Sequence, residues 1–331
     1  MLLIIHMQQC LGGGVNYYSI MDAANIKDAK IHEIVKTITS YIYTFHMPLF
    51  FFLFGEVYQY NTENTKFLEL IQKKSMRLLV PFILVFAFYY VPIMFLSGYF
   101  NKFNIFLYGQ IFFPDACYLW FLGALFCCYI LHWIIDKYIN LKYAKILLVQ
   151  CLWVFGIIIW KTLGEFAPVG NPFRYFIWFY IGSKWDTVVQ SISQCVGKQT
   201  QLIIAIVLYI MQIMLWSLSE YVGRGETLVT TISGFLVIPI FAFGIQRISK
   251  YVKEDWQPCI RKISSYSFGI YLYSDPLNYL LLYLFFKLFG IEGFSRNILS
   301  GVLYFSRIFI TALSAMVIVK LLKILKLKYL Y

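Results

Sequence analysis

The sequence predicts an all-α, polytopic helical membrane protein with about ten transmembrane spans, the first of them truncated at its N-terminal end. Of the 331 residues, 60% are hydrophobic and only 13% are charged, and the mean hydropathy is +0.70. A soluble chain has about 25% charged residues. Apolar stretches near the ~20 residues that a helix needs to cross a bilayer recur along the chain. No long hydrophilic insertion interrupts them, so residues 1–331 are expected to form a single domain.

The first apolar run, residues 1–11, is shorter than the others. A helix of this length extends about 16 Å, whereas the hydrocarbon core is about 30 Å thick. A signal-peptide core is the alternative, but no basic segment precedes the run and no clear cleavage site follows it. We therefore expect half of a first helix to lie upstream of Met1. Nine further spans are predicted at about residues 41–60, 76–98, 118–135, 145–160, 172–189, 201–219, 228–246, 265–288 and 301–319.

The distribution of lysine and arginine predicts the orientation. With the first span starting in the cytoplasm, the cytoplasmic segments hold 18 of the 28 basic residues and the outer segments hold 8. This bias is the one that the positive-inside rule describes. We therefore expect a multi-pass protein of the cell membrane with both termini in the cytoplasm. The net charge of +12 is then mainly an orientation signal, and the expected partner is the lipid bilayer, not nucleic acid.

Several sequence blocks occur in a characteristic order: "MLLIIH", then about forty residues to "FHMPLFFFLFGEVY", then "KSMRLLVPFIL", "YLWFLGALF", "RYFIWFYIGSKW" and "ISSYSFGIYLYSDPL". In order and spacing, over essentially the whole chain, they resemble the acyltransferase-3 family of integral membrane acyltransferases. The resemblance implies an O-acyltransferase that moves an acyl group, commonly acetyl from cytoplasmic acetyl-CoA, to a hydroxyl. The implied acceptor is a cell-envelope polysaccharide, a glycan precursor or a lipid-linked sugar on the far side.

The hallmark of this family is a basic residue and a histidine eleven positions apart in the first span, which places both side chains on one face of the helix. His6 matches the histidine, and its basic partner would fall before Met1, which agrees with a truncated start. Imidazole can remove the proton of an attacking hydroxyl near neutral pH, or can carry the acyl group itself as a nucleophile. A histidine at the membrane interface, satisfied by water, is the structural alternative.

His46 is the second catalytic candidate. The predicted topology places it one to two helical turns below the outer surface, where it could face an acceptor hydroxyl. Pro48 follows closely and frees a backbone carbonyl near Thr44, which is a common way to open a helix around a site. The alternative is that His46 packs or caps the helix structurally.

Three basic residues near the predicted cytoplasmic end of the third span are candidates for binding the phosphates of CoA: Lys73, Lys74 and Arg77. Positive-inside anchoring explains them equally well. Acetyl-CoA is expected as the donor substrate and no metal is expected, because the four histidines show no metal-binding spacing.

Four polar residues in the ninth span, Tyr271, Ser274, Asp275 and Asn278, follow the i, i+3, i+4, i+7 spacing of one helix face. Arg307 in the tenth span could neutralise Asp275. We interpret this face as substrate-lining, with helix packing as the alternative.

Arg174 in the sixth span could contact an acidic glycan, or could reach the membrane interface with its charged end. Two other functions stay open. A transporter or flippase for an envelope intermediate would also need polar groups within the membrane, but it predicts inverted repeats, which the sequence does not show. The second alternative is that the chain is a truncated, inactive homologue.

Overall fold

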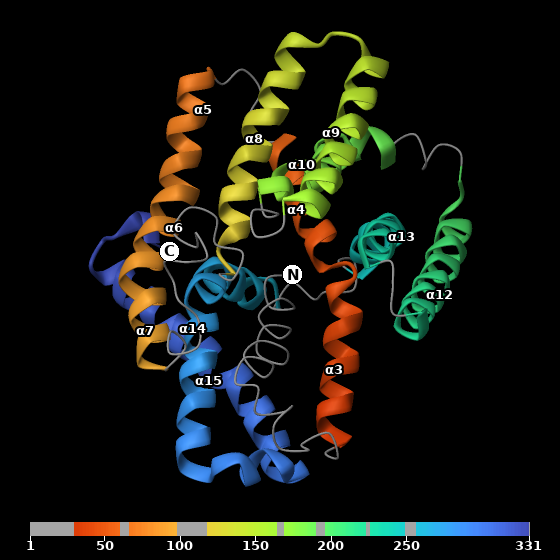
Figure 1. Cartoon of the computed structure of the whole chain (residues 1–331). Coiled ribbons are helices and arrows are strands. Elements are labelled where there is room, and N and C mark those ends of the chain that lie inside the picture. The colour runs from red at the N-terminus through yellow and green to blue at the C-terminus, as the bar shows by residue number, and fades with distance from the viewer. Residues whose placement is uncertain are drawn as a thin grey trace. The chain divides into compact units, whose positions relative to one another are not determined.

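The computed structural model describes residues 30–59, 66–97, 118–163, 169–189, 196–222, 226–248 and 256–330. Every regular element in these ranges is a helix (Figure 1), which confirms the predicted all-α class. The elements in chain order are α3 (Lys30–Tyr43), α4 (His46–Gln59), α5 (Phe67–Lys74), η2 (Ser75–Leu79), α6 (Val80–Val85), η3 (Phe86–Tyr90), α7 (Val91–Leu96), α8 (Trp120–Tyr138), α9 (Lys142–Thr162), α10 (Asn171–Ser183), α12 (Lys198–Val222), α13 (Glu226–Ile248), α14 (Gln257–Ser295), α15 (Asn297–Ile324) and η7 (Lys328–Leu330).

A helix overlaps each predicted span from the second to the tenth. Within the described residues, six helical stretches are long and apolar enough to cross a membrane. They are Lys30–Gln59, Phe67–Leu96, Trp120–Tyr138, Lys142–Thr162, Gln199–Leu218 and Asn297–Ile324. The predicted first span, with His6, lies outside the described residues. The structure thus confirms a helical protein with several potential membrane spans and does not establish the count of ten.

The stretch before the second predicted span differs from the sequence-based expectation. The predicted spans leave residues 12–40 as a connection between the first span and the second, but α3 begins at Lys30. The helix is amphipathic and buries His32, Val35 and Thr39, which are spaced i, i+3, i+7 on one face. Its exposed polar residues lower the hydropathy of the segment, so a scan for continuous apolar runs cannot detect it.

The residues group into two compact units, which are described separately. Unit 1 takes the described residues of Met1–Ile42, Ser75–Leu122 and Cys259–Tyr331. Unit 2 takes those of Tyr43–Lys74 and Gly123–Pro258. The prediction of a single domain stays a prediction.

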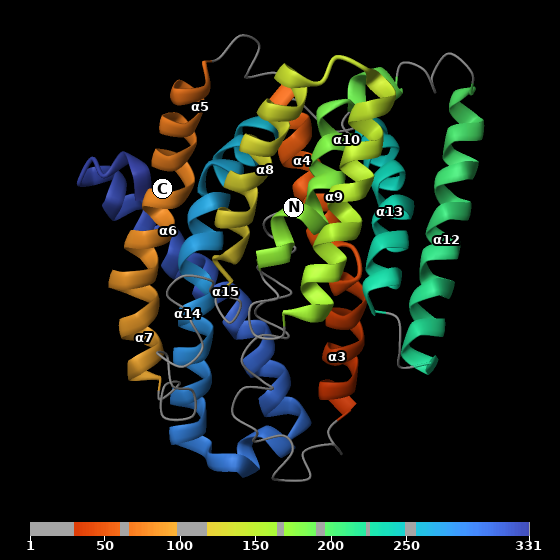
Figure 2. The same cartoon turned by 45° about the horizontal axis from the view of Figure 1, so that its top comes forward.

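In unit 2, helices α4 and α10 are in backbone contact at two glycines. A Cβ atom on Gly55 would lie 2.0 Å from the carbonyl oxygen of Phe179, and one on Gly182 would lie 2.0 Å from that of Phe52. Helices α4 and α10 lie side by side in both cartoon views (Figures 1 and 2), and α9 and α13 also pack against this pair. Small residues allow such close approach between helices in membranes. Both positions therefore require glycine.

In unit 1, π-helical turns precede two prolines. The π turn η2 leads into α6, which has Pro81 near its start, and η3 leads into α7, which has Pro92 near its start. A proline cannot donate the backbone hydrogen bond to the carbonyl four residues earlier, and membrane helices often adjust to this with a local π turn. The two prolines thus explain why this helical stretch is not a regular α-helix.

Helix α14 of unit 1 has its own proline, and tyrosines bond the carbonyls around it. Pro276 has no N–H to donate to the carbonyl oxygen of Leu272, four residues earlier. That oxygen accepts a hydrogen bond from the hydroxyl of Tyr118. The neighbouring carbonyl of Tyr273 accepts one from the hydroxyl of Tyr89 at 2.8 Å. The aromatic side chains therefore compensate for the backbone bond that the proline removes.

The α4–α10 contact predicts the effect of a single methyl group. Gly55→Ala should lower the free energy of unfolding by about 1–3 kcal/mol, because the two helices must separate to admit the new Cβ atom. The measurement is thermal unfolding in detergent, followed by circular dichroism.

Gly123→Ala in α8 is the matched control. A Cβ atom at Gly123 meets nothing within 4 Å, so alanine should keep or raise the stability, by up to about 1 kcal/mol. Equal unfolding temperatures for Gly55→Ala and the wild type would show that the backbone contact is not required.

Candidate active site

His46 is the first residue of α4, directly after a break in the helix. Helix α3 ends at Tyr43, and the chain makes a turn before α4 begins. The turn residue Thr44 accepts a hydrogen bond through its hydroxyl from Gln212 of α12, at 3.2 Å. The ring of His46 is buried and lies edge-on to that of Tyr43, with the centroids 4.8 Å apart. The helix opening predicted from Pro48 is present, and a catalytic role for His46 stays a prediction.

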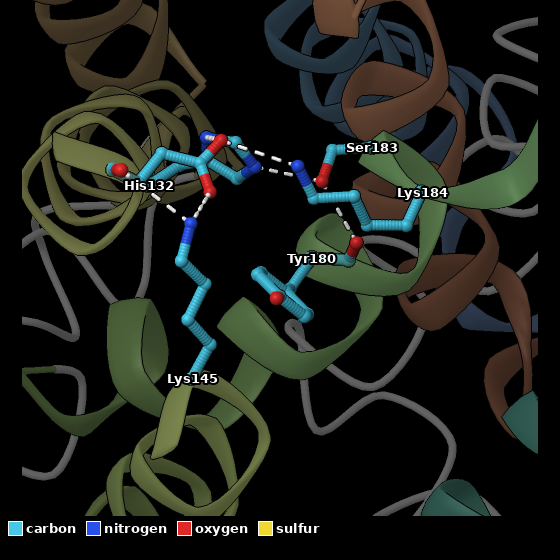
Figure 3. Close-up of polar contacts among 6 residues, drawn as sticks. His132, Lys145, Tyr180, Ser183 and Lys184 are labelled. Atoms are coloured by element: carbon cyan, nitrogen blue, oxygen red, sulfur yellow. Dashed lines mark hydrogen bonds and ion pairs between the residues drawn. The ribbon is translucent and has the colours of Figure 1, made fainter. Parts of the chain in front are cut away.

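A second polar cluster, which the sequence analysis did not predict, surrounds His132 in unit 2 (Figure 3). His132 of α8 is buried, and its Nε2 atom lies 2.7 Å from the hydroxyl oxygen of Ser183 at the end of α10. One turn along α8, the Asp136 carboxylate forms ion pairs with Lys145 of α9 at 2.7 Å and with Lys184 at 3.2 Å. The cluster therefore joins α8, α9 and α10.

The hydrogen bonds of this cluster indicate the tautomer of His132. The single hydroxyl proton of Ser183 is donated to the carbonyl oxygen of Tyr180 at 2.8 Å. The Ser183 oxygen then accepts a proton from Nε2 of His132, so Nδ1 presents a lone pair. That lone pair faces the Asp136 carboxylate 3.7 Å away, which is too far for a hydrogen bond. A serine, a histidine and an aspartate thus lie next to one another in space. The serine proton, however, is not directed at the histidine, as nucleophilic catalysis requires.

One sequence signal could have revealed part of the cluster. His132 and Asp136 are spaced i, i+4 on one helix, which places them on the same face. Lys145 and Lys184 come from other helices, and neither has a recognisable spacing to Asp136. Only the packing of α9 and α10 brings the two lysines to the carboxylate.

The three predicted CoA-binding residues have different surroundings. Lys73 forms an ion pair with Glu69 one turn earlier in α5, at 2.6 Å, and both side chains are exposed. The ammonium of Lys74 lies 3.7 Å from the ring centroid of Tyr129. Arg77 is exposed in the π turn η2, and among the described residues it forms no ion pair. Of the three, Arg77 has the side chain most available to an anion.

The predicted polar face of α14 lies inside unit 1. Tyr271, Ser274, Asp275 and Asn278 are all buried, and so is Arg307 of α15. Neutralisation of Asp275 by Arg307 stays a prediction. The structure thus places all five of these residues of α14 and α15 in one unit.

Arg174, which was also predicted to contact the substrate, belongs to α10 of unit 2. Its guanidinium carbon lies 4.8 Å from the ring centroid of Trp160 in α9 and 5.4 Å from that of Tyr175. Contact with these aromatic faces favours a structural anchoring role for Arg174.

His32 in α3 forms a buried contact that the sequence analysis missed. Its Nε2 atom lies 2.9 Å from the carbonyl oxygen of Phe294, which can only accept, so Nε2 carries the proton. Its Nδ1 atom then accepts the hydroxyl proton of Tyr304, at 2.7 Å. The Tyr304 ring in turn lies 6.0 Å from the Arg307 guanidinium carbon. Through these contacts α3 is attached to α14 and α15.

Comparison with known families gives the reaction class. A family model described as an acyltransferase domain, of the acyltransferase-3 type, matches residues 12–321. The chain belongs to the acyltransferase-3 family. Together with the six long apolar helices, membership of this family identifies a membrane acyltransferase. The matched range begins after His6, which is also outside the described residues. No curated protein and no solved structure matches the chain.

The Asp136 cluster predicts a stability effect. Asp136→Asn should lower the free energy of unfolding by about 1–3 kcal/mol, between the small values of exposed ion pairs and the larger cost of breaking a buried one. The physical reason is that Lys145 and Lys184 would face each other without a counter-ion. Chemical or thermal unfolding in detergent measures the change.

Glu69→Gln is the control, since it removes an exposed ion pair with Lys73 on the surface of α5. It should leave the stability close to that of the wild type, because exposed ion pairs contribute little. If Asp136→Asn and Glu69→Gln lower the free energy of unfolding equally, the Asp136 ion pairs do not stabilise unit 2 more than an exposed ion pair does.

Proposed function

We propose that this membrane acyltransferase moves an acyl group, acetyl in the first instance, from acyl-CoA in the cytoplasm to a hydroxyl of a cell-envelope glycan. The observation that carries the proposal is the family match over residues 12–321. In the reaction the hydroxyl oxygen attacks the thioester carbonyl carbon, and the carbon–sulfur bond breaks. The hydroxyl proton passes through a base to the leaving sulfur, so CoA departs as the free thiol. The acceptor is a polysaccharide, a glycan precursor or a lipid-linked sugar.

His6 is proposed as the base or as the acyl carrier, because it matches the family histidine in the sequence. His46 is the second candidate. Its burial at a break in the helix supports a role at a site, since irregular backbone within a membrane protein is tolerated where it is buried or lines a cavity. A neutral imidazole at either position can accept the hydroxyl proton.

Arg77 is proposed as the main contact to the CoA phosphates. Its exposed guanidinium can bind phosphate oxygens in a bidentate manner. Lys73 and Lys74 add positive charge nearby in the sequence, although Lys73 also pairs with Glu69 and Lys74 with the Tyr129 ring.

The ion pairs of unit 2 support the proposed orientation in the cell membrane, with both termini cytoplasmic. Lys145 and Lys184 are among the 18 basic residues that the predicted orientation places on the cytoplasmic side. Both contact the carboxylate of Asp136, at the C-terminal end of α8. Residues from two predicted cytoplasmic segments thus lie at the same end of this unit, as one orientation requires.

The proposed chemistry predicts that His6→Ala abolishes acyl transfer. A general base contributes about 10²- to 10⁴-fold to the rate, and loss of an acyl carrier would be at least as severe. His46→Ala should reduce transfer less, through the geometry of the helix break. Mass spectrometry of cell-surface glycans, after expression of each variant in cells that lack the protein, measures acetylation directly.

Cys10→Ala is the matched control, because it changes the same segment without removing a titratable imidazole. His132 is unsuitable as a control, since its removal would take away the hydrogen bond to Ser183 and leave a cavity in the buried cluster. If His6→Ala acetylates glycan fully and His46→Ala does not, the catalytic histidine is His46 of α4 and not His6. If the wild type acetylates no glycan, the transporter or inactive-homologue interpretation replaces the acyltransferase proposal.

The proposed phosphate contact predicts a donor-specific defect. Arg77→Ala should raise the KM for acetyl-CoA about 10-fold, the effect of losing one hydrogen bond to a charged group, and leave kcat nearly unchanged. The remaining KM should depend less on salt, because one screened charge is gone. Steady-state kinetics in proteoliposomes at two salt concentrations measure both effects.

Lys320→Ala, which removes an exposed lysine of α15, is the control and should leave this KM unchanged. An Arg77→Ala variant with the wild-type KM at both salt concentrations would limit Arg77 to membrane anchoring.

A further inference from the structure

Helix α12 carries a glutamine on the face that it turns toward the rest of unit 2. Of the side chains that the structure describes in this helix, Ala205 and Gln212 are the two buried ones, and they are spaced i, i+7 on one face. The opposite face is apolar, and Ile203, Ile210 and Met214 on it are each more than half exposed. Gln212 is completely buried, so its amide needs a hydrogen-bond partner inside the protein.

The partner of Gln212 is the turn that separates α3 from α4. Its Nε2 atom donates a hydrogen bond to the hydroxyl oxygen of Thr44, at 3.2 Å. Pro48, one turn further along, has no N–H to donate to the backbone carbonyl of Thr44. Helical bonding is regular again one residue later, where the Leu49 N–H donates to the Phe45 carbonyl at 3.1 Å. The proline thus removes a helical bond at Thr44, and the glutamine supplies a bond to the same residue from another helix.

Helix α13 also packs against the first turn of α4. A Cβ atom on Gly234 would lie 2.7 Å from the Cβ atom of Pro48, so the absence of a side chain lets α13 come this close. The ring centroids of Phe241 and Phe45 are 6.3 Å apart. Helices α12 and α13 therefore contact the break at Thr44, Phe45 and Pro48, the residues that surround His46 in the sequence.

Helix association alone does not account for where this hydrogen bond is made. A single hydrogen bond between membrane helices contributes little to stability, and a polar contact elsewhere on α4 would attach α12 equally well. This contact is instead made two residues before His46, at the residue where the helix is broken. Because the threonine side chain is restricted about χ1, a bond that holds its hydroxyl also holds the backbone of the turn.

We propose that Gln212 is a positioning residue for acyl transfer: by binding Thr44 it holds the helix break in place and thereby sets the location of the His46 imidazole. This inference rests on the proposed acyltransferase function, in which His46 is the second candidate for the base. Gln212 does not touch the reacting atoms and acts through the turn. A displacement of about 1 Å at a reacting group lowers a rate by up to about 100-fold, so the turn has to be held firmly.

The test compares the kinetics of variants in proteoliposomes, with acetyl-CoA and a water-soluble fragment of the glycan that the wild type acetylates in cells. Gln212→Leu removes the hydrogen bond and keeps a side chain of similar size. It should lower kcat about 10- to 100-fold and leave the KM for acetyl-CoA unchanged, because the imidazole moves while donor binding is not altered. Thr44→Val should have the same effect, and Thr44→Ser, which keeps the hydroxyl, should recover most of the lost rate.

Gln201→Leu is the matched control. Gln201 lies in the first turn of α12 and donates to the Val196 carbonyl at 3.0 Å, so its replacement also removes a glutamine hydrogen bond but does not affect the break. It should keep the wild-type kcat. Thermal unfolding in detergent should give similar unfolding temperatures for Gln212→Leu, Gln201→Leu and the wild type, because each hydrogen bond contributes little. A loss of rate without a loss of stability is not explained by general structural damage.

Double variants test whether Gln212 acts through the break and His46. Two changes that disrupt the same interaction are not additive. Gln212→Leu combined with Thr44→Val should therefore be about as slow as either single variant. In protein that carries His46→Ala, Gln212→Leu should cause no further loss of kcat. If Gln212→Leu lowers kcat by the same factor with and without His46, Gln212 does not act through the imidazole and the proposal is wrong.

The outcomes separate this proposal from the proposed function. If the wild type acetylates a glycan and both Gln212→Leu and Thr44→Val keep its kcat, Gln212 only attaches α12, and the positioning role is wrong while the acyltransferase proposal stands. A fully active His46→Ala variant leads to the same conclusion. If the wild type acetylates nothing, the proposed function itself fails, and the role of Gln212 fails with it. Should Gln212→Leu not fold, Thr44→Val alone decides between these results.

Discussion

The backbone contact between α4 and α10 is the constraint on which unit 2 depends. Because Gly55 and Gly182 have no side chains, each helix approaches the other to within contact of its carbonyl oxygens. Ser183 follows Gly182 directly, so the same approach that packs the helices also sets the depth at which its hydroxyl meets His132. The polar cluster on α8 is thus positioned by a contact between two other helices, and a larger residue at either glycine would displace it.

Most of the buried polar groups that the structure describes are satisfied from within the protein, because neither a bilayer nor an apolar core supplies hydrogen bonds. Pro276 removes one backbone bond of α14, and tyrosine hydroxyls bond the exposed carbonyls. Among the described residues, the exceptions include Nδ1 of His132 and the polar side-chain atoms of Ser233, Ser274 and Asn278, which have no hydrogen-bond partner.

The basic residues show why charge alone does not identify a binding site in a membrane protein. Their uneven distribution is explained by orientation, and the structure gives several of them additional structural contacts. Lys145 and Lys184 neutralise Asp136, and Lys74 lies over the Tyr129 ring. Arg77 is left exposed, within a π turn that precedes a proline. Its availability, and not its charge, separates it from the other candidates.

The sequence by itself determined the helical class, the approximate positions of the helices from the second to the tenth predicted span, and the membership of an acyltransferase family. These follow from local properties: apolar runs, helical spacing and short motifs. Tertiary structure alone decided that α3 begins at Lys30, that His32 bonds Tyr304, and that Asp136 gathers lysines from two other helices. It also distinguished Ser274 and Asn278 from their hydrogen-bonded neighbours. The physical reason is that partners far apart in sequence meet only through packing, which no local pattern encodes.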